Sequence, residues 1–149
     1  MTDTSWQIPD PDTQPEFYHD VPVKRLVAWC ADTIITLFLC VIILPFTAFT
    51  GLFFLPLLFL TVGFFYRLAT VTQGSATLGM RLMSIEFITL RGERFDKTYA
   101  FWHCLSFTVS CVIPPLLVAS GVMMLTTARG QGLTDVMLGT LAVNRRAAM

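Results

Sequence analysis

Three long apolar segments, separated by polar stretches, dominate the pattern of this 149-residue chain. The first runs from Leu26 to Phe46 and is long enough to cross a bilayer, because about 20 residues at 1.5 Å each span the hydrocarbon core. The second, Gly51 to Tyr66, follows a short uncharged turn. We therefore expect a transmembrane hairpin of two antiparallel helices, and we expect Pro56 to kink the second helix.

The third apolar segment, Ala100 to Leu125, is broken near its midpoint by Pro114 and Pro115. Each half has about 12 residues, which is too short to cross a bilayer alone. The segment either spans the membrane as one kinked helix or folds back at the prolines as a re-entrant or interfacial hairpin. The sequence leaves both alternatives open, and with them the side on which the carboxyl terminus lies.

A polar segment from Arg67 to Tyr99 connects the hairpin to the third apolar segment. Its basic residues outnumber its acidic ones, and Lys24 and Arg25 stand at the start of the first helix. Basic residues favour the cytoplasmic side of a membrane, so both signals place the amino terminus and this loop in the cytoplasm. Alternating residues from Leu82 to Thr89, followed by a turn at 91–93, favour a short β-hairpin in the loop.

Residues 1–22 contain four prolines and five acidic residues, with no basic start before an apolar run. This pattern excludes a cleavable signal peptide and predicts a mostly disordered tail. Docking of Trp6, Phe17 and Tyr18 onto the membrane or the protein is the less favoured alternative. We expect a membrane domain over residues 23–143 and a short carboxyl-terminal tail over residues 144–149.

The composition predicts an all-α integral membrane protein. Its surroundings, and hence its expected partner, are the lipid bilayer. Hydrophobic residues make up 54% of the chain, charged residues 13%, and the mean hydropathy is +0.66. Ten basic residues balance ten acidic ones, so no basic field predicts a nucleic-acid partner. The four cysteines lie in apolar segments without a C-x-x-C motif, so we interpret them as packing residues and predict no metal site.

No motif predicts an enzyme or a cofactor. The chain lacks Gly-x-Ser-x-Gly and His-Glu-x-x-His. The glycine spacing of Gly74 to Arg81 resembles a phosphate-binding loop, but Met80 and Arg81 occupy the positions of its lysine and hydroxyl residue. Nucleotide binding is therefore rejected.

Asp32 is the residue that most needs an explanation. It interrupts the first apolar segment, and a carboxylate at that depth costs about 2.5–3.5 kcal/mol on insertion scales. Arg25 lies on the same helix face but about 10 Å away, too far for a direct pair. Arg67 closes the predicted second helix near the same interface. We expect one of these two arginines to supply the counter-charge.

His103, Ser106 and Ser110 form a small polar stripe at helical spacing in the third segment. In membrane helices such a stripe is usually a packing seam. A proton-handling His103 is the alternative.

Three motifs in order resemble the RDD family of bacterial membrane proteins. They are Arg25-Leu-Val-Ala-Trp-Cys-Ala-Asp32, the Gly-x-x-Thr-x-Gly-x-Arg-Leu of 74–82, and Gln-Gly-Leu-Thr-Asp-Val-Met-Leu-Gly-Thr of 131–140. The resemblance assigns the family's arginine and two aspartates to Arg25, Asp32 and Asp135. Its supporting positions are Gly74, Thr77, Gly79, Arg81, Gly132, Gly139 and Thr140. Thr134 departs from the pattern, because many members carry a histidine there.

The resemblance implies a multi-pass protein of the bacterial inner membrane with a role in transport, including cation/proton antiport. Two hypotheses follow. In the first, Asp32 alternately binds a proton or a small cation, and the chain works as a homo-oligomer or with a membrane-protein partner, because two or three helices cannot enclose a pathway alone. In the second, the protein is a non-transporting scaffold in which Arg25, Asp32 and Asp135 form a structural ion-pair network.

Overall fold

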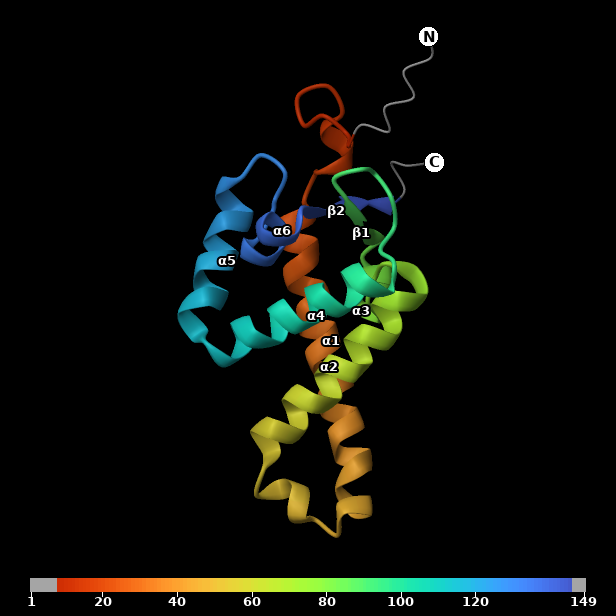
Figure 1. Cartoon of the computed structure of the whole chain (residues 1–149), viewed down its shortest axis with the longest axis vertical. Coiled ribbons are helices and arrows are strands. Elements are labelled where there is room, and N and C mark those ends of the chain that lie inside the picture. Colours follow the sequence, from red (N-terminus) through yellow and green to blue (C-terminus); the bar gives the residue numbers. More distant parts are fainter. Residues whose placement is uncertain (1–7, 146–149) are drawn as a thin grey trace.

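Two antiparallel helices form the long axis of the protein in the computed structural model, which describes residues 8–145 (Figure 1). Helix α1 spans Val21–Ile43 and helix α2 spans Leu55–Gly74, and both are long and apolar enough to cross a membrane. Two short 3-10 helices, Leu44–Thr47 and Thr50–Leu52, connect them. The predicted hairpin is therefore present.

Two details of α2 differ from the prediction. Pro56 lies in the first turn of the helix, where its missing N–H costs no hydrogen bond, so it begins α2 instead of kinking it. The helix also continues past Arg67 to Gly74. Arg67 therefore lies about two turns inside the helix and does not close it.

The third apolar segment forms two helices, α4 (Lys97–Val112) and α5 (Pro114–Thr126), bent by 117°. Ile113 between them is extended, and Pro114 and Pro115 begin the new helix, where prolines are tolerated. Figure 1 shows α4 crossing the α1/α2 pair and α5 turning back toward the end that carries the sheet. Neither helix alone is as long as α1.

The sheet has two strands that are distant in the sequence. Strand β1 (Ile85–Thr89) pairs antiparallel with β2 (Thr140–Asn144), with Ile85 opposite Asn144 and Thr89 opposite Thr140. The strand expected within Leu82–Thr89 is present, but its ladder partner is β2, and the expected local hairpin is reduced to one bridge. The turn at 91–93 brings Arg94 back to Ile88, and these two residues form a single antiparallel bridge.

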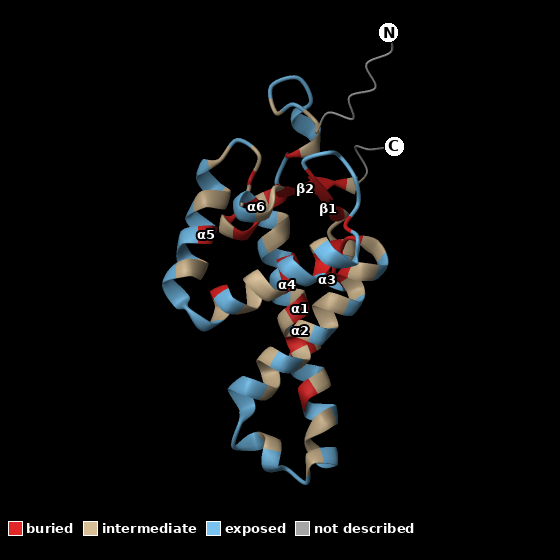
Figure 2. Cartoon of the chain, viewed as in Figure 1, coloured by how far each residue is buried: buried red, intermediate tan, exposed pale blue. Residues whose placement is uncertain are grey.

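Two short helices complete the fold at the sheet end, α3 (Leu78–Leu82) before β1 and α6 (Leu133–Leu138) before β2. Buried residues concentrate there, whereas the far half of the α1/α2 hairpin is largely exposed (Figure 2). Since that exposed surface is apolar, including Phe38, Phe53 and Leu57, it suits contact with lipid. The buried core therefore lies at one end of the spanning helices.

The amino-terminal segment is more ordered over its described part than the sequence suggested. Pro15–Phe17 form a 3-10 helix, and Tyr18 is buried against Leu141 and Val143 of β2, with Ile8 packed beside it. The Tyr18 hydroxyl donates to the Pro9 carbonyl at 2.5 Å. Trp6 lies outside the described residues, as do residues 146–149 of the expected carboxyl-terminal tail.

Candidate functional site

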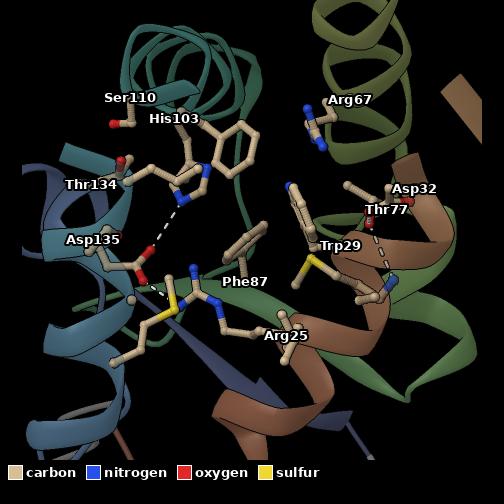
Figure 3. Close-up of a pocket in the computed structure, with 18 of the residues that line it drawn as sticks. Arg25, Trp29, Asp32, Arg67, Thr77, Phe87, His103, Ser110, Thr134 and Asp135 are labelled. Carbon is tan, nitrogen blue, oxygen red and sulfur yellow. Dashed lines mark hydrogen bonds and ion pairs between the residues drawn. The ribbon is translucent and has the colours of Figure 1, made fainter. Parts of the chain in front are cut away.

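A cavity of about 380 Å³ lies between the spanning helices and the sheet end. Its wall combines apolar side chains with the charged and titratable residues that the sequence singled out. Figure 3 shows side chains from α1, α2, α4 and α6 turned toward this space. The polar residues that line it are Arg25, Asp32, Arg67, Thr77, His103, Ser110, Ser120, Thr134 and Asp135.

Asp32 is held by three neutral donors. Its Oδ1 accepts from the Tyr66 hydroxyl at 2.7 Å and from the Gly79 N–H at 3.0 Å, and its Oδ2 accepts from the Thr77 hydroxyl at 2.6 Å. The side chain is almost completely buried. Among residues 8–145, neither Arg25 nor Arg67 is a hydrogen-bond or ion-pair partner of Asp32, so the expected arginine counter-charge is replaced by hydroxyl and backbone donors.

The first glycine-rich motif builds this cradle. Thr77 caps α3 by accepting from the Met80 N–H at 3.2 Å while its hydroxyl donates to Asp32. Gly79 touches α1 so closely that a Cβ there would lie 2.3 Å from the Ala28 carbonyl oxygen and 2.9 Å from Asp32 Oδ1. The motif therefore presses the start of α3 against α1 and places two of the donors to Asp32.

The other two positions of that motif fix the end of α2. Arg81 donates to the Thr70 carbonyl at 2.9 Å. Its guanidinium lies over Gly74, where a Cβ would come within 2.9 Å of Arg81 Nη2. Gly74 and Arg81 therefore connect α2 to α3 and lie away from the cavity wall.

Asp135 is completely buried, and its partners include the charged side chain of Arg25 and the imidazole of His103. The Arg25 guanidinium donates to Oδ2, and His103 Nε2 lies 3.0 Å from Oδ1 (Figure 3). The carboxylate can only accept, so His103 contributes its Nε2–H to this bond. The Gly132 N–H donates to Oδ2 at 3.0 Å, and the Thr140 hydroxyl donates to Oδ1 at 3.3 Å. Asp135 thus joins α1, α4, α6 and β2.

Burial raises the pKa of Asp135, but the Arg25 charge and the hydrogen bond from His103 outweigh burial and hold the pKa well below its ordinary range. Asp135 is therefore an anion at neutral pH. Arg25 has further contacts, because it donates to the Gly130 carbonyl at 3.3 Å and lies 5.5 Å from the centroid of the Phe87 ring. The pair is a fixed part of the wall.

The glycines of the last motif place Asp135. At Gly132 a Cβ would lie 2.5 Å from Ser120 Oγ and 2.6 Å from Met124 Cε, so α6 begins in direct contact with α5. Gly139 ends α6 with a left-handed φ of 64°, a conformation that favours glycine. Thr134 is buried in the cavity wall, and the imidazole beside Asp135 comes from α4 instead.

Arg67 lies across the cavity from the Arg25–Asp135 pair. Its guanidinium carbon is 4.3 Å from the centroid of the Phe107 ring. Within the described residues the guanidinium makes no hydrogen bond or ion pair. Gly63 lies one turn earlier on α2, where a Cβ would make ordinary van der Waals contact with Arg67 Nη1 at 3.7 Å and with Thr36 Cγ2 at 3.4 Å.

Residues of all three motifs thus line one cavity between apolar helices. The sequence model of the RDD family matches residues 21–139, most of the chain. The chain belongs to the RDD family. Searches of curated proteins and of solved structures found no match. With two helices able to cross a bilayer, this RDD chain is a membrane protein.

Sequence reasoning found the two carboxylates of the RDD chain but missed some of their partners. It did not name Tyr66, whose spacing of three residues from Gly63 puts both on the α2 face toward α1. It treated His103 mainly as a packing residue, whereas the structure places it on Asp135. It expected one network of Arg25, Asp32 and Asp135, but Asp32 has a separate set of partners.

Proposed function

We propose that this RDD protein performs proton-coupled transport across the bacterial inner membrane, with Asp32 as the proton-binding group. The observation that carries the proposal is a buried carboxylate on the wall of a cavity between spanning helices, held only by neutral donors among the described residues. Intramembrane carboxylates of this kind often mark proton or ion pathways. The role assigned to the chain is not enzymatic.

Protonation of Asp32 would change its contacts with α2 and α3. As an anion it accepts three hydrogen bonds, but a neutral carboxyl group has one O–H that must donate. The Gly79 N–H cannot reverse its role, so the hydroxyl of Tyr66 or Thr77 must turn or leave. Because Tyr66 lies on α2 and Thr77 begins α3, proton binding would alter the contacts of α1 with both helices.

A proton suits this site better than a metal cation. The Gly79 N–H directs its partial positive charge at Oδ1, and the charged guanidinium of Arg67 lines the same cavity, so both disfavour a bound cation. The cation/proton exchange implied by the family resemblance predicts proton movement when sodium, potassium or lithium is added to vesicles.

We place the sheet end of the molecule in the cytoplasm. Lys24, Arg81, Arg91, Arg94 and Arg145 lie near that end, whereas the turn over residues 44–54 has no charged residue. The positive-inside rule then puts the amino terminus inside, with α4 and α5 as a re-entrant pair. Two spans and a bent pair do not enclose a continuous pathway, so we propose a homo-oligomer or a membrane-protein partner.

Proton movement in everted membrane vesicles tests the proposal. Vesicles with equal amounts of wild type, Asp32→Asn or Glu93→Gln are given a pH gradient, acid inside. Sodium, potassium or lithium chloride is then added outside, or decanesulfonate is loaded into the vesicles beforehand so that it can leave with protons. Glu93 is an exposed loop carboxylate and serves as the matched control. We expect one of these solutes to dissipate the gradient with wild type and Glu93→Gln but not with Asp32→Asn.

A structural scaffold is the second candidate, and the Arg25–Asp135–His103 cluster favours it because that cluster ties α1, α4 and α6 together. A scaffold role predicts no proton flux with any of the four solutes and failure of Asp32→Asn to accumulate. That pair of results would overturn transport for these solutes.

A further inference from the structure

We propose that the cavity binds an amphiphilic organic anion from the bilayer, with Arg67 contacting its charged group. This names a substrate class for the proposed transport function and rests on it only for the movement of the bound molecule. Binding itself can be measured without flux, so the two proposals fail separately.

The first observation is the state of the Arg67 guanidinium. It has a ring contact with Phe107 but, among the described residues, no hydrogen bond and no carboxylate partner. Asp32 is a carboxylate on the same cavity wall, yet both of its oxygens already accept hydrogen bonds from other groups. An unpaired arginine inside a spanning helix is unfavourable, and a ligand that supplies a carboxylate, sulfonate or phosphate group would satisfy it through paired N–H donors.

The second observation is the position of Arg67 between two cavities. The first has a volume of about 380 Å³ and the second, toward the far end of the hairpin, about 370 Å³. Arg67, Trp29 and Leu117 line both. A head group at Arg67 would therefore have space on either side of it.

The third observation is the apolar character of the remaining wall. Leu26 and Leu125 line the first cavity and are 61% and 76% exposed, so they form an edge open to the surroundings of the spanning helices. A ligand with an alkyl chain can enter there from the hydrocarbon. A metal cation or an alkyl ammonium ion would instead meet the unpaired charge of Arg67.

The remaining charges leave the cavity suited to an anion. The Arg25 charge is already matched by Asp135, and Asp32 is enclosed by its three donors. Protonation of Asp32 would add a net positive charge to the wall. Anion binding at Arg67 and proton binding at Asp32 would then favour each other, which is the coupling that proton-driven uptake of an anion requires.

Fluorescence of Trp29 tests the assignment, because this side chain lines both cavities beside Arg67. The other two tryptophans are replaced in a Trp6→Phe, Trp102→Phe background, and the full chain is reconstituted in phosphatidylcholine nanodiscs. The probes share one alkyl chain length and differ in charge: decanesulfonate, decanol and decyltrimethylammonium. We expect saturable binding of decanesulfonate and at least about tenfold weaker binding of the other two.

Variants separate the charge of Arg67 from general packing. Arg67→Gln should weaken decanesulfonate binding by about tenfold or more, Arg67→Lys should retain most of it, and the exposed control Arg91→Gln should leave it unchanged. Equal binding of decanol and decanesulfonate to wild type overturns the proposal, whether or not Arg67→Gln folds. Unchanged affinity in a folded Arg67→Gln also overturns it.

Competition identifies the source of the anion. Displacement of decanesulfonate by phosphatidylglycerol in the nanodisc supports the site and assigns it to a lipid head group with its chains. Displacement by inorganic phosphate alone would overturn the amphiphile and indicate a soluble anion. If decanesulfonate does not bind to wild type but the Asp32-dependent proton flux is intact, this ligand class is rejected and the proposed transport function stays in place.

Discussion

Asp32 and Asp135 lie on one cavity but are stabilised in different ways. Asp135 faces an arginine and a histidine, whereas Asp32 faces two hydroxyl groups and a backbone N–H. An ion pair resists loss of either charge, but neutral donors can adjust to a protonated or an ionised carboxyl group. At the residue scale, therefore, Asp135 is held as an ion, whereas the neutral donors around Asp32 are the observation that supports its proposed role in proton binding.

Replacing Asp135 with Asn should strongly destabilise the protein. Arg25 would remain almost buried, with its side chain 12% exposed, opposite a neutral group, and breaking a buried pair in this way costs about 3–5 kcal/mol. Equilibrium unfolding in mixed micelles measures the loss. As a control, Asp20→Asn removes the carboxylate of the His19–Asp20 pair, whose side chains are 76% and 60% exposed, and it should cost less than about 1 kcal/mol. Equal losses in the two variants would contradict the structural role of Asp135.

The stabilisation from Asp135 should persist into acid. Its pKa in the folded protein is depressed, so its contribution is complete above the unfolded value of about 3.9 and is lost only as the pH falls toward the lower folded value. The difference in unfolding free energy between wild type and Asp135→Asn should therefore be constant between about pH 5 and pH 8 and shrink below about pH 4. A difference that shrinks near pH 6 would show that Asp135 is not held as an anion.

Gly79 should tolerate no side chain. Gly79→Ala places a Cβ 2.3 Å from the Ala28 carbonyl oxygen, so α3 must move away from α1 and the Asp32 cradle must open. We expect a loss of about 1–3 kcal/mol or more. Gly121→Ala in α5 is the matched control, because its Cβ would meet nothing within 4 Å and alanine favours a helix. Thermal unfolding of both variants in detergent should show the first destabilised and the second unchanged or stabilised.

At the scale of elements, β2 is the segment that closes the structure. It pairs with β1, packs on the amino-terminal segment through Leu141 and Val143, and its Asn144 accepts from Lys24 Nζ at 2.7 Å. It also follows α6 directly, so the strand and the Asp135 site form together. Folding of this end therefore requires contacts between the first 30 residues and the last 20, roughly the greatest sequence separation in the chain.

Leu141→Ala tests the importance of this strand. Leu141 is completely buried, so the substitution should cost about 2–5 kcal/mol of unfolding free energy. Leu125→Ala removes the same atoms from a side chain that is 76% exposed and should have little effect in the same mixed-micelle titration. Similar losses for both would indicate that β2 is not part of the core.

At the scale of the whole molecule, charge and shape agree. The sheet, the described part of the amino-terminal segment and Arg145 lie at one end of the α1/α2 pair, and the uncharged turn lies at the other (Figure 1). Because α5 turns back toward the sheet, both ends of the described chain lie on that side. This arrangement fits a hairpin of two spans with a re-entrant pair.

Alkaline phosphatase fusions test this topology, because the enzyme is active only outside the cytoplasm. A fusion after Phe49 should be active, and fusions after Gly92 and after Arg145 should be inactive. An active fusion after Arg145 would show that α4 and α5 cross the membrane as one broken span. Green fluorescent protein fusions at the same positions provide the opposite readout and control for expression.

The sequence by itself determined the membrane class, the hairpin and the family. The membrane class and the hairpin follow from the length of the apolar segments, which is a local property. The family follows from three motifs in a fixed order along the chain, which contain Arg25, Gly79 and Asp135. The strand at Ile85–Thr89 also followed from local alternation. The sequence did not determine the strand's partner, because β2 pairs with it across a long separation that no periodicity reports.

Only the tertiary structure decided which charges meet. Arg25 and Asp32 share a face of α1, yet Arg25 turns to Asp135 on α6, and Asp32 is satisfied by α2 and α3. Helix spacing fixes the face that a residue occupies, but its partner depends on how separate elements pack. The close approach of Gly79 to Ala28 and Asp32 sets part of that packing, and it joins residues far apart in the sequence.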